Sequence, residues 1–368
     1  MSELRISPRR NVEGLGVYVA GKPIEEVRRE LGLKNVIKLA SNENPFGCSP
    51  LAEAALRSTI EQVSLYPESM APNLATRLGL HLGVDSDKVM ISNGSDEIIR
   101  LLTRAYIRPG DEAIMADVTF PRYDTNVRIE NGTPVAVPLI EGVHDLTGML
   151  NVITDKTRMI FVCNPNNPTG TLVDKDPLLS FIRQVPQDVL LVIDEAYYEY
   201  VRTDRYLETI PLLDDYPNLI IVRTFSKIYG LASLRIGYGL MRPEIIAHLA
   251  KVKEPFNTNR FAQAAALASL DDPGFVARCA EHNASEREWL VRELTDIGLE
   301  AFPSHANFLM VKLHRSGKEV SDNLLARGII VRSGHLLGYD DTIRVTIGNQ
   351  EENRLFAAAL RDIIEATE

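Results

Sequence analysis

Cysteine is scarce in this chain of 368 residues, and its three copies are Cys48, Cys163 and Cys279. They lie far apart and form no C-x-x-C pair, which favours a reducing compartment and offers no zinc-ligand pattern. No apolar run reaches the roughly 18 residues that a membrane-spanning helix needs. The first residues also lack the apolar segment of a signal peptide. We therefore expect a cytoplasmic protein without a membrane partner and without a bound metal.

Positive charge is also in short supply. The chain has 40 Lys and Arg against 50 Asp and Glu, for a formal net charge of -10. No basic run of the kind that binds nucleic acid is present, so we expect no nucleic-acid partner. No G-x-G-x-x-G sequence follows an early strand, which disfavours a nicotinamide dehydrogenase. The remaining composition, 45% hydrophobic and 24% charged, is ordinary for a globular enzyme.

Apolar runs alternate with helical patterns through the first two thirds of the chain. A short helix at residues 95–106 is predicted from its apolar spacing. Five short apolar runs predict strands within residues 88–92, 111–117, 158–163, 188–194 and 218–224. Nearly continuous apolar strands that alternate with helices imply a mostly parallel sheet covered on both faces. We predict an α/β fold of this kind.

The last third of the chain has a different pattern, with a long charged helix at 277–298 and short strands within 307–313, 328–332 and 342–348. This pattern predicts a smaller α+β domain. The length of the chain also suits two domains. We therefore expect an N-terminal arm at 1–35 that packs with the small domain, a large domain at 36–255 and a small domain at 256–368.

Polar residues gather in four loops, and each loop directly follows a predicted strand. The loops are Asn93–Asp96, Asn164–Gly170, Asp194–Tyr197 and Thr224–Lys227. The carboxyl ends of parallel strands face a common crevice, where ligands bind. Residues more than a hundred positions apart are therefore expected to line one site.

The helix that begins near Ser95 and Asp96 could hold a phosphate at its N-terminus, although plain N-capping is the commoner use of these side chains. Asn167 would bring an amide to the same crevice. Asp194 ends a buried strand, where a carboxylate needs a partner. That partner is either an ion pair or helix cap within the protein, or a protonated ring nitrogen.

Lys227 is the centre of the predicted site. In a desolvated pocket near other cations the pKa of a lysine falls, and its amine can form a Schiff base with an aldehyde. Arg235, helped by the hydroxyls of Thr224 and Ser226, could hold a phosphate. A Schiff-base lysine, an anion facing a ring nitrogen and a phosphate cradle are the requirements of pyridoxal 5'-phosphate.

The motifs resemble those of the fold-type I pyridoxal-phosphate aminotransferases, and most of all the histidinol-phosphate aminotransferase branch. They occur in the order of that family: KLASNENPFG, LYPE, SNGSDE, TFPRY, NPNNPTG, IDEAY, TFSK with LRIGY, GIIVR and IRVTIG. The resemblance covers nearly the whole chain. It implies a large domain with a mostly parallel sheet and a smaller α+β domain.

The resemblance also implies a role for each matching residue. Lys227 would form the Schiff base, and Asp194 would face the pyridinium nitrogen. The remaining cofactor residues would be Tyr197 and Asn167 at the phenolic oxygen, Phe120 on the ring face, and Ser95, Asp96, Thr224, Ser226 and Arg235 at the phosphate. Tyr66 would reach the phosphate of a neighbouring subunit, which implies a homodimer with shared sites. Tyr18, Asn44, Arg332 and Arg344 would bind the substrate.

The activity that this resemblance implies is a transaminase of histidine biosynthesis. It would interconvert L-histidinol phosphate and 2-oxoglutarate with imidazole-acetol phosphate and glutamate. An aromatic amino-acid aminotransferase of the same branch is the close alternative, because the two arginines suit either substrate. A pyridoxal-phosphate decarboxylase of the phosphothreonine type is a third possibility. A non-catalytic binding protein is disfavoured because both Lys227 and Asp194 are present.

Overall fold

The computed structural model describes residues 6–17, 19 and 21–366, and its main element is a seven-stranded sheet in the order β2-β8-β7-β6-β5-β3-β4. The strands are β2 (Val89–Ser92), β3 (Glu112–Ala116), β4 (Thr133–Val137), β5 (Thr157–Cys163), β6 (Leu190–Asp194), β7 (Leu219–Thr224) and β8 (Gly237–Leu240). Strand β8 runs antiparallel to both of its neighbours, and the other adjacent pairs are parallel. The predicted mostly parallel sheet is confirmed.

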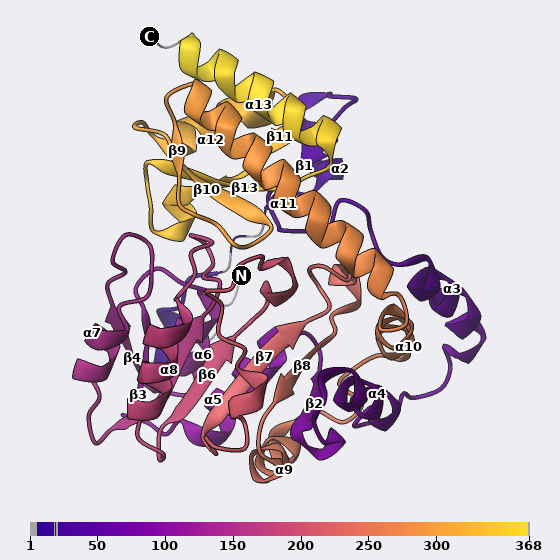
Figure 1. Cartoon of the computed structure of the whole chain (residues 1–368), viewed down its shortest axis with the longest axis vertical. Helices are drawn as coiled ribbons and strands as arrows, with labels where there is room; N and C mark the ends of the chain where they lie inside the picture. Colours follow the sequence, from indigo (N-terminus) through magenta and orange to yellow (C-terminus); the bar gives the residue numbers. More distant parts are fainter. Residues whose placement is uncertain (1–5, 18, 20, 367–368) are drawn as a thin grey trace.

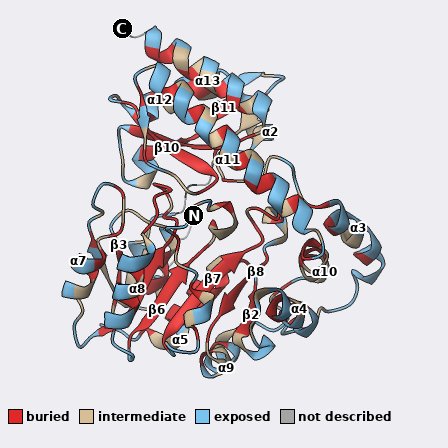
Figure 2. Cartoon of the chain, in the orientation of Figure 1, coloured by how far each residue is buried: buried red, intermediate tan, exposed pale blue. Residues whose placement is uncertain are grey.

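Helices cover both faces of this sheet because successive side chains of a strand point to opposite faces. In β5, Ile160 and Val162 join one apolar cluster, whereas Met159 and Phe161 join the other. The first cluster packs under α4 (Pro72–Leu82), α7 (Leu146–Asn151), α8 (Lys175–Gln184) and α10 (Arg260–Ser269). The second packs under α5 (Ser95–Tyr106), α6 (Arg122–Ile129) and α9 (Pro243–Val252). The strands other than the edge strand β4 are accordingly buried along nearly all of their length (Figure 2).

A smaller body lies above this sheet (Figure 1). Its four-stranded antiparallel sheet has the order β12-β13-β10-β9. The strands are β9 (Glu300–Ala301), β10 (Phe308–Lys312), β12 (Arg332–Ser333) and β13 (Thr342–Thr346), and the helices are α11 (Pro273–Asp296), α12 (Gly317–Ala326) and α13 (Gln350–Glu365). Apolar residues of α12, α13 and the last turns of α11 pack on one face of this sheet. The predicted α+β character of this part is confirmed.

The N-terminal residues contact both bodies. The side chain of Asn11, in α1 (Arg10–Glu13), donates to the carbonyls of Arg128 and Ile129 at the end of α6. Further along, Val27 of α2 (Ile24–Leu31) packs with Ile330 of β11 (Ile329–Ile330), and β1 (Ile37–Lys38) pairs in parallel with β11. The described part of the arm therefore runs from the large body to the small one.

The packing favours a later domain boundary than residue 255. Helix α10 packs against α3 (Pro50–Thr59), and Phe275 and Cys279 at the start of α11 belong to the core of the large sheet. Leu290 and Leu294 near the end of the same helix belong to the core of the small body. We propose that the boundary lies within the 24-residue helix α11, which runs from one body into the other (Figure 1).

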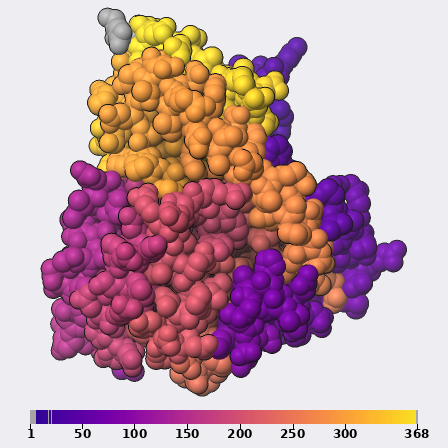
Figure 3. Space-filling model, viewed as in Figure 1, coloured from indigo at the N-terminus to yellow at the C-terminus, as the bar shows by residue number. Residues whose placement is uncertain are grey.

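The two bodies touch directly, as the space-filling view shows (Figure 3).

No helix within the described residues combines the length and the apolar character needed to cross a membrane.

Candidate active site

The four polar loops meet at one edge of the large sheet. Strands β5, β6 and β7 are parallel, and β2 shares their direction because β8 is antiparallel to both β2 and β7. Their carboxyl ends therefore face the same crevice, where a cavity of about 160 Å³ lies between the two bodies. Twelve of the predicted site residues line it: Ser95, Asp96, Phe120, Asn167, Asp194, Tyr197, Thr224, Ser226, Lys227, Arg235, Arg332 and Arg344.

Lys227 reaches this cavity from the turn after β7. The Thr224 hydroxyl accepts the backbone N–H of Ser226 at 3.0 Å, which shapes the turn. The Lys227 Nζ donates to the carbonyl of Ser41 at 3.3 Å and lies 5.8 Å from the centre of the Tyr197 ring. Burial, and next the positive charge of Arg344, lowers the pKa of Lys227 to about 8. The amine therefore loses its proton far more readily than an exposed lysine does.

Asp194 lies at the carboxyl end of β6 and is almost fully buried. Its Oδ2 accepts a hydrogen bond from the hydroxyl of Tyr123 at 2.7 Å, and its Oδ1 accepts the N–H of Ala196 at 3.1 Å. Burial raises the pKa of Asp194 to about 6, and the two donors oppose that rise. The carboxylate is thus prepared for a positively charged partner in the cavity.

Tyr123 was not predicted as a site residue. It is a fully buried residue of α6 whose ring stacks on Phe161, with centroids 4.6 Å apart. The motif TFPRY contains it, but nothing in the sequence shows that its hydroxyl meets Asp194, which lies 71 positions away.

The N-terminus of α5 forms a cradle with Arg235. The helix begins after Gly94, which has φ +74°, and no side chain caps it. The capping alternative for Ser95 and Asp96 is therefore wrong. Arg235 donates to the Ser226 hydroxyl at 3.2 Å, and it lies 3.7 Å from the Asp96 carboxylate. The left-handed φ at Gly94 favours glycine, and a Cβ there would lie 2.6 Å from Arg235 Nη2, so a larger residue would have to displace that guanidinium.

The cavity wall toward the small body is built by two arginines. Arg332 and Arg344 face each other across β12 and β13, and each side chain is only 7% exposed. Arg344 donates to the Asn167 Oδ1 at 2.6 Å and to the carbonyl of Ala40 at 2.9 Å. Arg332 donates to the carbonyl of Val19. Two neighbouring guanidinium groups repel each other, so this wall favours an anionic ligand.

Comparisons with known proteins agree with this geometry. The profile of the family "Aminotransferase class I and II" matches residues 34–360. The chain belongs to the class I and II aminotransferase family. It is 46% identical over 354 residues to the histidinol-phosphate aminotransferase of Geobacillus sp. (strain WCH70), covering 96% of this chain and 97% of that protein. The corresponding protein of Bacillus subtilis (strain 168) is 45% identical, covering 96% of this chain and 99% of the relative.

A solved structure shows the same fold. The crystal structure of histidinol-phosphate aminotransferase from Sinorhizobium meliloti in complex with pyridoxal-5'-phosphate aligns with a TM-score of 0.91. The two chains are 29% identical, and the alignment covers 100% of this chain and 99% of the other. The predicted fold-type I architecture of this aminotransferase is confirmed.

Tyr197 and Asn167, the two residues predicted to meet the phenolic oxygen of the cofactor, both line the aminotransferase cavity. The Tyr197 hydroxyl accepts the side-chain N–H of Asn42 at 3.0 Å, and its ring meets Phe308 edge-on with centroids 5.2 Å apart. Burial raises the pKa of Tyr197. The hydroxyl therefore stays protonated at neutral pH and can donate a hydrogen bond to a ligand oxygen.

Asn44, which was predicted for the substrate pocket, does not line this cavity. Its amide donates to the carbonyl of Ile228 at 2.7 Å, and it borders a separate small hollow. Asn42, two positions earlier, lines the cavity instead. Its backbone has φ +56°, a left-handed conformation that asparagine tolerates and that redirects the chain between the two residues.

Tyr66 also lies outside the cavity. Tyr66 is 78% exposed, and its ring stacks on Phe256 at 4.5 Å on the surface. Tyr18 lies outside the described residues. A second cavity of about 540 Å³ adjoins the first and shares Phe120, Asn167, Arg332 and Arg344 with it. This second space can receive the body of a substrate whose reacting end lies beside Lys227.

Proposed function

We propose that this aminotransferase uses pyridoxal 5'-phosphate to interconvert L-histidinol phosphate and 2-oxoglutarate with imidazole-acetol phosphate and L-glutamate, a step of histidine biosynthesis. Nearly full-length similarity to histidinol-phosphate aminotransferases, at 46% and 45% identity, supports this activity. The observation that carries the proposal is one cavity that combines Lys227, Asp194 and the uncapped N-terminus of α5.

The residues of the cavity fit pyridoxal 5'-phosphate. The cofactor supplies an aldehyde that bonds to an amine and a ring that draws electrons from the substrate Cα. The uncapped helix N-terminus, the Arg235 guanidinium and the Thr224 and Ser226 hydroxyls would hold its phosphate. Glycine at 237 fits the same cradle, because a Cβ there would lie 2.6 Å from the backbone nitrogen of Ser95.

Asp194 and Tyr123 would act as a pair at the ring nitrogen. The carboxylate would keep a proton on that nitrogen, because a negative charge in a buried site favours the protonated form. The Tyr123 hydroxyl bond, 2.7 Å long, orients the carboxylate and helps to keep it ionised. Tyr197 and Asn167, which line the same cavity, would donate to the ring oxygen.

Lys227 would move the proton that transamination requires. Its pKa of about 8 lies near neutral pH, so the neutral amine could accept a proton from the substrate Cα and deliver it to the cofactor carbon on the other side of the amino nitrogen. The carbonyl of Ser41 accepts a hydrogen bond from Lys227 Nζ at 3.3 Å, and this bond holds the amine in the cavity.

The two arginines would bind the acidic ends of the substrates. Arg344 is anchored on Asn167 and on the carbonyl of Ala40, so its guanidinium presents a fixed face to a carboxylate. Arg332 borders both cavities, where it would meet the phosphate of histidinol phosphate or the distal carboxylate of 2-oxoglutarate. Tyr18 remains a predicted substrate residue.

A homodimer with shared sites and a cytoplasmic location belong to the same proposal. The surface segment around Tyr66 exposes several large apolar side chains: Ile60, Val63, Leu65, Tyr66, Met70 and Phe256. Several exposed large apolar side chains on one segment are typical of an interface. The exposed Tyr66 would reach the phosphate cradle of the second subunit.

A half-reaction panel tests the activity. Purified enzyme loaded with cofactor is mixed separately with histidinol phosphate, phenylalanine, tyrosine or phosphothreonine, and the cofactor absorbance at about 400 nm is followed. We expect histidinol phosphate to convert the band with the highest kcat/KM. A faster reaction with phenylalanine or tyrosine would establish the aromatic alternative, and release of carbon dioxide from phosphothreonine would establish the decarboxylase.

A further inference from the structure

The surface segment that carries Tyr66 is held by side chains of a second segment, residues 253–263. Residues 66–68 have neither helical nor strand structure, and the Tyr66 side chain points outward. Three of the carbonyls in the segment accept hydrogen bonds: that of Ser69 from Lys253 Nζ at 2.9 Å, that of Tyr66 from Arg260 at 2.5 Å and that of Glu68 from Gln263 at 3.0 Å. The direction of Tyr66 therefore depends on residues 253–263.

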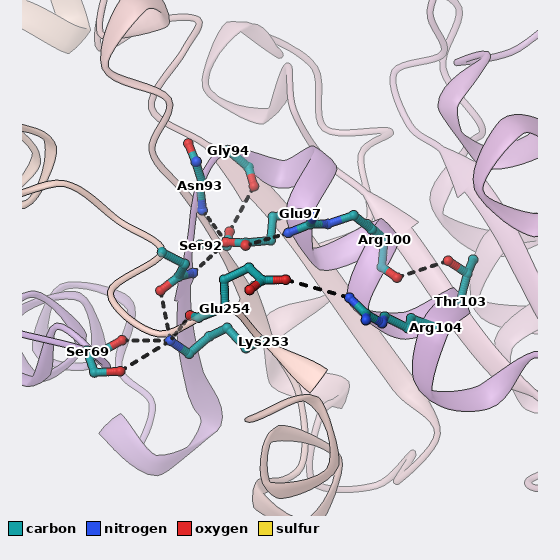
Figure 4. A network of polar contacts seen from close by, with 11 residues as sticks. Ser69, Ser92, Asn93, Gly94, Glu97, Arg100, Thr103, Arg104, Lys253 and Glu254 are labelled. Atoms are coloured by element: carbon teal, nitrogen blue, oxygen red, sulfur yellow. Dashed lines mark hydrogen bonds and ion pairs between the residues drawn. The ribbon is translucent and has the colours of Figure 1, made fainter. Parts of the chain in front are cut away.

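The second segment is in turn anchored on a buried carboxylate. Lys253 Nζ donates to the Asn257 Oδ1 at 2.9 Å, and the Asn257 amide donates to Glu97 Oε2 at 2.5 Å. Figure 4 shows Lys253 between Ser69 on one side and the Glu97 region on the other. A continuous chain of hydrogen bonds thus joins α5 to the backbone beside Tyr66.

The same Glu97 oxygen also fixes the phosphate cradle. It accepts the backbone N–H of Asn93 at 2.6 Å, directly before Gly94 and the start of α5. The other carboxylate oxygen accepts from Arg100 at 2.9 Å, which balances the charge of a side chain only 4% exposed. Removing a buried carboxylate that accepts several hydrogen bonds costs free energy, because each of its donors is then left buried without an acceptor.

We propose that Glu97 is a positioning residue that couples the two halves of a shared site. In its own subunit it holds the loop that receives the cofactor phosphate. Through Asn257 and Lys253 it holds the segment that presents Tyr66 to the other subunit. Cofactor binding in one subunit therefore depends on Glu97 of both. This inference rests on the homodimer with shared sites proposed above.

A heterodimer separates the effect of Glu97 on the phosphate loop of its own subunit from its effect on the site of the other subunit. One chain carries Lys227→Ala and the other carries Tyr66→Phe, and two different affinity tags isolate the mixed dimer. Only one of its two sites then combines Lys227 with Tyr66, and only the chain with Lys227 yields the band at about 400 nm. Titrating the cofactor-free heterodimer with pyridoxal 5'-phosphate gives the Kd of that single site.

Glu97→Gln is placed on the Lys227→Ala chain, which supplies only Tyr66 to the measured site. We expect the Kd of the other chain's site to rise about tenfold, a change of about 1.4 kcal/mol that matches one lost charged hydrogen bond. A Kd within twofold of the control heterodimer would overturn the coupling. A control heterodimer without the band, or the absence of any dimer, would instead overturn the proposed function together with this inference.

Lys253→Met provides a variant that leaves the buried carboxylate intact, should Glu97→Gln fold poorly. It removes the donor to Ser69 without touching the cradle. We expect it to weaken cofactor binding when it lies on the Lys227→Ala chain and to leave the Kd unchanged when it lies on the Tyr66→Phe chain. Equal effects in both placements would contradict the proposed path. Lys251→Met, at an exposed position in the last turn of α9 and two residues before Lys253, is the matched control.

Discussion

Replacing Lys227 by methionine is expected to stabilise the cofactor-free protein. The pKa of this lysine falls from 10.5 to about 8, mainly because of burial. At about 1.36 kcal/mol per pH unit, this fall corresponds to about 3 kcal/mol of destabilisation in the folded state. Lys227 is of intermediate burial, so solvent screens part of this effect. We therefore expect the free energy of unfolding to rise by about 2 kcal/mol at pH 7.

The pH dependence gives this prediction its sign. Between pH 8 and 10.5 the folded wild-type protein binds fewer protons at this position than the unfolded chain does. The destabilising contribution is therefore complete below pH 8, shrinks as the pH rises and vanishes above the unfolded pKa. The advantage of the variant should fall to below about 1 kcal/mol at pH 10.

Urea unfolding of the cofactor-free proteins at pH 7 and pH 10, at equal protein concentration, measures this difference. Lys251→Met, at an exposed position of α9, is the control and should change stability by less than about 0.5 kcal/mol. A Lys227→Met protein that is less stable than wild type at pH 7 would refute the reasoning. So would a stability gain that stays constant from pH 7 to pH 10.

Three further substitutions test the walls of the cavity. Tyr123→Phe removes the hydroxyl that donates to Asp194 at 2.7 Å, so the pKa of the Asp194 carboxyl should rise. The acidic side of the pH profile of kcat/KM should then move up by about one pH unit. A profile that does not move would contradict the pairing of Tyr123 with Asp194. Gly94→Ala places a Cβ 2.6 Å from Arg235 at φ +74°, so the cofactor Kd should rise at least tenfold in an absorbance titration. An unchanged Kd would show that the cofactor phosphate binds elsewhere. Arg344→Lys loses the paired bonds to Asn167 and Ala40 and should raise KM for glutamate about a hundredfold, whereas an unchanged KM would remove Arg344 from the substrate wall.

Much of the fold could be predicted because buried parallel strands have nearly continuous apolar sequences. The runs that became β5, β6 and β7 are of this kind. Two strands of the large sheet were not predicted. Strand β8 contains Gly237 and Gly239 and has little apolar pattern, and β4 is an edge strand with exposed positions. Tertiary pairing, rather than local preference, makes these two segments strands.

The loops of the candidate site could be predicted because each follows a strand, and the strand direction then brings the loops together. The contacts between side chains within the site could not be predicted from the sequence. Tyr123 meets Asp194 only because α6 packs over β5 and β6. Asn42 and Asn44 lie in one short motif, and only the left-handed backbone at Asn42 decides which of them lines the cavity. Local patterns also do not show that α11 contributes to both cores.

The central claim is that Lys227 carries the cofactor. The most direct measurement treats the native protein with borohydride in the presence of pyridoxal 5'-phosphate and then locates the added mass by peptide mass spectrometry. We predict a pyridoxyl group on the peptide that contains Lys227 and on no other lysine. An unmodified Lys227 peptide from protein that has bound the cofactor would contradict the account.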